Sequence, residues 1–197
     1  MRTVLALAAS ILSTTALANA TPGQPAPAFT VTDLAGKPVN LADYKGRTVV
    51  LEWHNFGCPF VQKHYRSGNM QSLQKRYAND VVWLAVNSTT KTASDYTEPA
   101  TLSKQLGDFH AAPARYLMDE PGTVGKAYGA RTTPHMYIID PSGKVVYNGA
   151  IDDKRSTDVA DVKGAKNYVV AALDEMKAGK PVSVASTTPY GCTVKYK

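Results

Sequence analysis

The sequence is poor in cysteine and has no block of like charge. Only two of its 197 residues are cysteines, Cys58 and Cys192, and two cysteines cannot form the disulfide framework on which small secreted domains depend. A chain of this length can fold on one hydrophobic core instead. The 22 basic and 16 acidic residues are dispersed, so we expect no nucleic-acid partner.

The first twenty residues have the pattern of a secretory signal peptide. Arg2 is a short basic region, residues 4–17 are small and apolar, and Ala18-Asn-Ala20 is a small-residue cleavage motif. Because the apolar stretch is too short for a lasting membrane span, we expect cleavage after residue 20 and export to the periplasm or the medium. An uncleaved anchor is the alternative.

The stretch from residue 48 to residue 64 places a thiol at the start of a helix. An apolar strand, Thr48–His54, is followed by Gly57, Cys58 and Pro59. Proline suits the first helical position, where an N–H would have no partner. A helix N-terminus carries partial positive charge and favours a thiolate. We therefore interpret Cys58 as a redox-active residue rather than a buried structural thiol.

The rest of the pattern predicts one α/β domain with a mixed central sheet and helices on both faces. The signal peptide (1–20) precedes the domain (21–180), and an irregular tail (181–197) carries Cys192. The run 80–86 is almost entirely apolar, which is typical of a parallel strand covered on both faces. Further strands are expected at 29–32, 115–118, 135–140 and 144–148, and helices at 60–77 with a break near 67–69, 98–107, 122–128 and 159–176.

In this order the segments resemble the redoxin branch of the thioredoxin fold. The matching motifs are Gly23-Gln-Pro-Ala-Pro-Ala-Phe29, Asp33-x-x-Gly-Lys37, Thr133-Pro134 and Tyr137-Ile-Ile-Asp140. A closer resemblance is to peroxiredoxin-like exported proteins with a C-P-F/Y-V-x-K segment, here Cys58–Lys63, and a Y-G-C-x-V-K-Y tail, here Tyr190–Tyr196. The resemblance implies a thioredoxin-like three-layer fold with an N-terminal redoxin extension.

The resemblance also implies residue roles. Cys58 stands where thioredoxins have the first cysteine of C-x-x-C, and Val61 replaces the second. Cys192 then either resolves a mixed disulfide from the tail, forms a permanent disulfide with Cys58, or stays unpaired. Glu52 matches the buried acid that transfers protons, and burial would raise the pKa of its carboxyl. Thr133-Pro134 matches the cis-proline loop that faces the cysteine and binds a substrate backbone.

One departure concerns the peroxide site of true peroxiredoxins, which has the pattern P-x-x-x-(T/S)-x-x-C. Leu51 and Asn55 occupy the proline and Thr/Ser positions here. Asn55 can donate a hydrogen bond to a substrate, but the pattern is not met.

We consider three functions. The first is an exported thiol–disulfide oxidoreductase without a cofactor, acting on a disulfide-containing protein or a small thiol or peroxide and regenerated by an external thiol reductant. The second is a peroxiredoxin-like thiol peroxidase. The third is a non-catalytic thioredoxin-like module, or a copper or zinc chaperone using Cys58, His54 and His135, although no local metal-ligand spacing supports a metal site.

Overall fold

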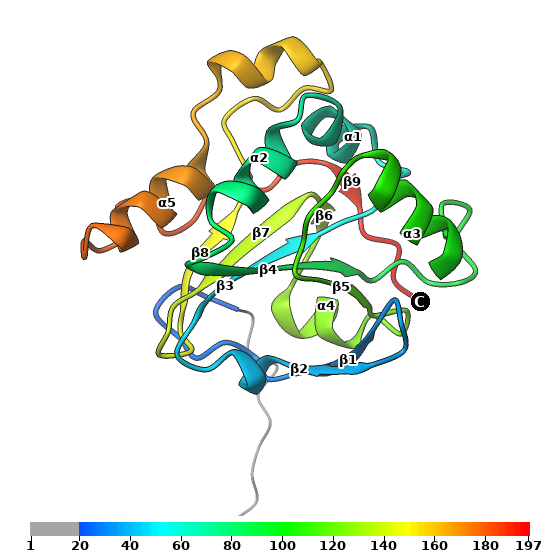
Figure 1. Ribbon diagram of the computed structural model, residues 1–197, viewed down its shortest axis with the longest axis horizontal. Coiled ribbons are helices and arrows are strands. Elements are labelled where there is room, and N and C mark those ends of the chain that lie inside the picture. The colour runs from blue at the N-terminus through cyan, green and yellow to red at the C-terminus, as the bar shows by residue number, and fades with distance from the viewer. Residues whose placement is uncertain (1–19) are drawn as a thin grey trace, which may run out of the picture.

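Seven strands form one central sheet in the order β2-β1-β5-β4-β3-β7-β8 (Figure 1). The computed structural model describes residues 20–197, so the predicted signal peptide lies, apart from Ala20, outside the described residues. Strands β3, β4 and β5 are parallel and the other pairs are antiparallel, which confirms the predicted mixed sheet. The strands are β1 (Thr30–Asp33), β2 (Pro38–Asn40), β3 (Thr48–Trp53), β4 (Val81–Asn87), β5 (Arg115–Met118), β7 (His135–Ile139) and β8 (Val145–Gly149).

Helices cover both faces of this sheet, as expected (Figure 1). One face carries Val50 of β3 and packs against four helices; the other carries Leu51 and packs against α4 and the N-terminal segment. The two faces alternate along β3 because successive side chains of a strand point to opposite sides. The helices are α1 (Pro59–Arg66), α2 (Asn69–Arg76), α3 (Pro99–Asp108) and α5 (Tyr168–Lys177) on the first face, and α4 (Thr123–Tyr128) on the second; a short 3₁₀ helix η1 (Leu41–Tyr44) precedes β3.

The predicted single helix over residues 159–176 is wrong. The segment forms a 3₁₀ helix, η2 (Val159–Gly164), followed after a break by α5. Asn167 causes the new start, because its side chain accepts a hydrogen bond of 3.0 Å from the Val170 N–H and caps the helix. The break expected near residues 67–69 is confirmed, with Gly68 at φ 72° between α1 and α2.

The tail is more regular than the sequence indicates. It runs along β8, where Asn148 exchanges backbone hydrogen bonds with Ala185 and Thr187. It then forms strand β9 (Cys192–Thr193), which pairs antiparallel with β6 (Thr132–Thr133) in a second, two-stranded sheet. Within residues 20–197, no helix is both long and apolar enough to cross a membrane.

The central position of β4 gives a test of this packing. Val86 is fully buried, so Val86→Ala should lower the free energy of unfolding by about 2 kcal/mol through lost burial and a residual cavity. The matched control is Val159→Ala, since Val159 is 40% exposed, and it should change stability by less than about 0.5 kcal/mol. Urea unfolding measures both, and equal losses would contradict the assigned packing.

Candidate active site

Cys58 lies at the N-cap of α1, with Pro59 at the first helical position as predicted. The Cys58 carbonyl accepts the helical hydrogen bond from the Gln62 N–H at 2.9 Å. The thiol is 2% exposed, and its Sγ donates to the carbonyl oxygen of Thr133 at 3.0 Å. The thiol therefore lies between the positive end of a helix and the loop that precedes β7.

The turn between β3 and Cys58 is braced by Asn55. Its side-chain oxygen accepts from the Gly57 N–H at 2.7 Å, while its amide donates to Thr89 Oγ1 at 3.0 Å. The same amide contacts the Asp95 carboxylate and carbonyl at 3.3 Å. These bonds tie the turn to the loop after β4, and a substrate role for Asn55 stays a prediction.

The loop that faces Cys58 contains the expected cis peptide bond, between Thr133 and Pro134. Thr133 is buried and belongs to β6. Its carbonyl oxygen accepts the hydrogen bond from the Cys58 thiol. In the register of β6 and β9, Thr133 lies opposite Cys192. Thr133 thus contacts both segments that carry a cysteine.

Cys192 is brought to Cys58 by the tail. Cys192 packs against the hydrophobic cluster that contains Cys58, and both thiols are free. Burial, a hydrogen bond with Cys58 and the Cys58 charge raise the pKa of Cys192 to about 12. The two cysteines that the sequence left without an assigned pairing are therefore neighbours.

Further backbone contacts hold the tail beyond Cys192. The Val194 N–H donates to the Arg131 carbonyl at 3.0 Å, and the Thr90 N–H donates to the Lys195 carbonyl at 2.9 Å. The Tyr196 hydroxyl donates to the Ala130 carbonyl at 2.6 Å. These contacts fix the tail after β9, and the bonds of Ala185 and Thr187 to Asn148 fix it before β9.

Glu52 is fully buried on the α1 side of β3. Trp83 Nε1 donates to its carboxylate at 2.8 Å, and the Tyr65 hydroxyl donates at 3.0 Å. Burial raises the pKa of Glu52 to about 7, although both hydrogen bonds act in the opposite direction. Tyr65 lies on α1 two turns beyond Cys58, and no described hydrogen bond joins Glu52 to either cysteine.

Three of the four histidines, His54, His64 and His135, are buried. Burial lowers the pKa of His54, His64 and His135 to about 3 in each case, so all three are neutral near pH 7. His54 pairs through Nδ1 with the Tyr116 hydroxyl at 2.9 Å. No group of three or more His, Cys, Asp or Glu side chains within residues 20–197 is placed to hold a metal ion.

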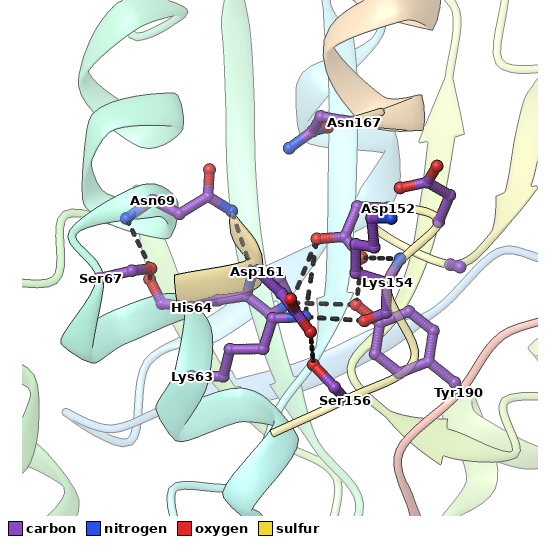
Figure 2. A network of polar contacts seen from close by, with 12 residues as sticks. Lys63, His64, Ser67, Asn69, Asp152, Lys154, Ser156, Asp161, Asn167 and Tyr190 are labelled. Carbon is purple, nitrogen blue, oxygen red and sulfur yellow. Dashed lines mark hydrogen bonds and ion pairs between the residues drawn. The ribbon is translucent and has the colours of Figure 1, made fainter. Parts of the chain in front are cut away.

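A buried polar network beside the tail was missed from the sequence (Figure 2). It joins Lys63 and His64 of α1 to Asp152 and to Tyr190 of the tail. Lys63 and Tyr190 belong to the two motifs that carry the family resemblance, which was the available signal. Nothing in the sequence around Asp152 indicates its part.

The carboxyl of Glu52 gives a pH test. Its pKa is about 7 in the folded protein against an ordinary 4.5, so the folded state holds the proton more tightly between these values. Stability from this group is therefore present at low pH and lost as pH rises towards about 7, a change of ~2 kcal/mol between about pH 5 and about pH 8. Glu52→Gln should remove this slope in urea unfolding.

The control for this test is Glu98→Gln, because Glu98 is exposed. It should keep the slope of the unaltered protein. An unchanged slope in Glu52→Gln would show that the group does not titrate near neutral pH.

The curated "Thiol-disulfide oxidoreductase ResA" of Bacillus thuringiensis subsp. konkukian is 29% identical over 127 residues, which are 63% of this chain and 66% of that protein. The match thus spans just under two thirds of the relative's length. Its name agrees with the prediction of a thiol-dependent oxidoreductase.

Solved structures extend the likeness to most of the chain. An uncharacterized conserved protein from Geobacillus kaustophilus has a TM-score of 0.75 and 30% identity, covering 90% of this chain and 93% of its own. The thioredoxin domain of a thiol-disulfide oxidoreductase from Bacteroides vulgatus has a TM-score of 0.53 and 23% identity, covering 73% of this chain and 96% of its own. The second likeness confirms the predicted thioredoxin-like fold.

The family model described as "AhpC/TSA family" matches residues 22–148, which include β3, the thiol turn and the loop around Pro134. The predicted relationship to the redoxins is confirmed, and the chain belongs to the AhpC/TSA family.

Proposed function

We propose that this protein is an exported thiol–disulfide oxidoreductase in which Cys58 attacks the substrate and Cys192 resolves the intermediate. The observation that carries the proposal is the meeting of two free thiols at Thr133, one from the start of α1 and one from β9. Val61 stands at the position of a local resolving thiol, so the tail supplies the second thiol.

In the first step the Cys58 thiolate attacks one sulfur of a substrate disulfide. A bond forms between Cys58 Sγ and that sulfur, the substrate S–S bond breaks, and the departing thiolate takes a proton. The N-terminus of α1 stabilises the attacking thiolate electrostatically. In the resting protein the thiol proton is directed to the Thr133 carbonyl.

In the second step Cys192 loses its proton and attacks Cys58 Sγ. The mixed disulfide breaks, the second substrate thiolate leaves, and Cys58 and Cys192 form an intramolecular disulfide; the substrate has gained two electrons. Burial is the largest cause of the raised pKa of Cys192, and the hydrogen bond with Cys58 and the Cys58 charge add to it.

The remaining roles are part of the same proposal. Glu52, whose pKa of about 7 suits proton exchange near neutral pH, takes up and returns the protons of the two thiols. Thr133 and Pro134 line the approach to Cys58. An external thiol reductant regenerates the enzyme, and the substrate is a molecule that contains a disulfide. No cofactor is required, because the electrons stay on sulfur.

Removal of the second thiol tests the cycle. Cys192→Ser should retain attack by Cys58 and accumulate a mixed disulfide on Cys58, because no thiol remains to displace the substrate. Intact-mass spectrometry after reaction with a disulfide-linked peptide would show one substrate half per chain. The unaltered protein should instead lose two mass units of hydrogen and carry no adduct.

The matched variant is Cys58→Ser, which should form no adduct, because it lacks the attacking thiol and burial, the largest cause of the raised Cys192 pKa, remains. An adduct on Cys192 in that variant, or full turnover by Cys192→Ser, would contradict the proposal. Rapid consumption of hydrogen peroxide by the unaltered protein, with no disulfide exchange, would favour the thiol peroxidase.

Export rests on the predicted signal peptide and has its own test. Expressed with its full sequence in a bacterium that has a periplasm, the protein should be recovered from the periplasmic fraction with Thr21 at its N-terminus, as intact mass would show. Ala20→Arg should block cleavage, because the cleavage site requires a small residue. Recovery of the full-length chain in the cytoplasm would exclude export.

A further inference from the structure

The tail is held by a buried polar network just before Cys192 (Figure 2). The Tyr190 hydroxyl donates to Asp152 Oδ1 at 2.5 Å and lies 3.2 Å from His64 Nε2. Tyr190 is 4% exposed, and Cys192 follows it after a single residue, Gly191. The contacts of this hydroxyl therefore fix the backbone close to the second thiol.

The other side of the network comes from the helix that carries the first thiol. The Lys63 ammonium donates to the Lys154 carbonyl at 2.7 Å and lies 4.0 Å from Asp152 Oδ2, and the Lys63 side chain is fully buried. His64 Nδ1 contacts the Asn69 amide at 3.0 Å, which fixes the ring. Asp152 is oriented in turn by the Lys154 N–H at 2.9 Å.

The ring of Tyr190 also contacts the helix that carries Cys58. It lies edge-on to Phe60, with centroids 5.8 Å apart, and the Lys63 ammonium is 5.6 Å from its centroid. A buried lysine and a buried aspartate are costly to enclose, and removing one partner of such a pair costs more than replacing both with apolar residues. A gain in folding stability therefore does not explain why Lys63 and Asp152 are buried here. Positioning of the tail by these residues does explain why they lie between the two segments that carry the thiols.

Gly191 joins Tyr190 to Cys192 and packs closely against the thiol loop. It has φ 141°, and a Cβ at this residue would overlap the Thr133 carbonyl oxygen, the same oxygen that accepts from Cys58. The tail thus approaches the thiol loop as closely as a backbone can, and the hydroxyl of Tyr190 sets the direction of that approach.

We infer that Tyr190 is a positioning residue for the resolving step, held by the socket of Lys63, His64 and Asp152. It fixes Cys192 against Cys58 and so raises the effective concentration of the second thiol. This inference rests on the proposed function. Because the two thiols are already neighbours, the disulfide can form with the socket contacts intact.

The test is Tyr190→Phe, which keeps the ring and removes the hydroxyl. The probe is a nitroaromatic disulfide whose released thiolate is coloured; attack by Cys58 releases the first thiolate and resolution by Cys192 the second. The first rate should stay within about twofold, while the second should fall about tenfold, the factor expected for loss of one hydrogen bond to a charged group. The equilibrium constant for forming the Cys58–Cys192 disulfide should fall by a similar factor, which raises its reduction potential by about 30 mV.

The matched control is Tyr128→Phe. The Tyr128 hydroxyl is likewise hydrogen-bonded, donating to the Pro27 carbonyl at 2.8 Å, but it lies on the other face of the sheet, so both rates and the potential should be unchanged. Asp152→Asn is a second socket variant and should slow the second release without changing the first.

The outcomes separate the two proposals. If Cys192→Ser still releases the second thiolate, the proposed function fails. If that release depends on Cys192 but has the same rate and potential in Tyr190→Phe and Asp152→Asn, the positioning role fails while the proposed function stands. An equal slowing of both steps in Tyr190→Phe would show a general structural defect and would also overturn the inference.

Discussion

The carbonyl oxygen of Thr133 is the point on which the arrangement of the site depends. It accepts from the Cys58 thiol, and its residue pairs with Cys192 across the two-stranded sheet. The central sheet makes this possible, because β3 and β7 are antiparallel neighbours. The end of β3 that leads to the thiol therefore lies beside the start of β7 that follows Pro134.

Burial sets the pKa values of the other titratable side chains near the site. Glu52 lies in the core with its carboxyl hydrogen-bonded by Trp83 and Tyr65, and burial still raises its pKa to about 7. The buried histidines His54, His64 and His135 have the opposite response, since burial disfavours their charged form and lowers the pKa. Near pH 7 the three buried histidines are therefore neutral, while Glu52 is close to the midpoint of its titration.

Much of the fold and part of the site could be predicted from local pattern. The strand before Cys58, the proline after it and the glycine break after α1 are short-range signals, and the structure has each at the expected place. The failure over residues 159–176 arose because the capping side chain of Asn167 starts a new helix inside an apolar periodicity. Periodicity records which face is buried but does not record such a break.

The site is less predictable because its contacts join segments far apart in the chain. Cys58 and Cys192 could be suspected as partners only by counting cysteines and by resemblance, since neither spacing nor composition places the tail on β6. Asp152 illustrates the limit: it has no local motif, and its importance comes from the approach of Lys63, His64 and Tyr190.

Strand β9 has a consequence for what can reach the thiol. The backbone of β9 pairs with β6 beside Cys58. An exposed strand edge can bind an extended polypeptide as an additional strand. Here that edge is closed by the chain's own C-terminus. A long peptide that pairs with residues 132–133 along it must first displace residues 192–193, and with them the second thiol. A peptide bound along β6 would therefore keep Cys192 away from Cys58, the thiol that it has to resolve.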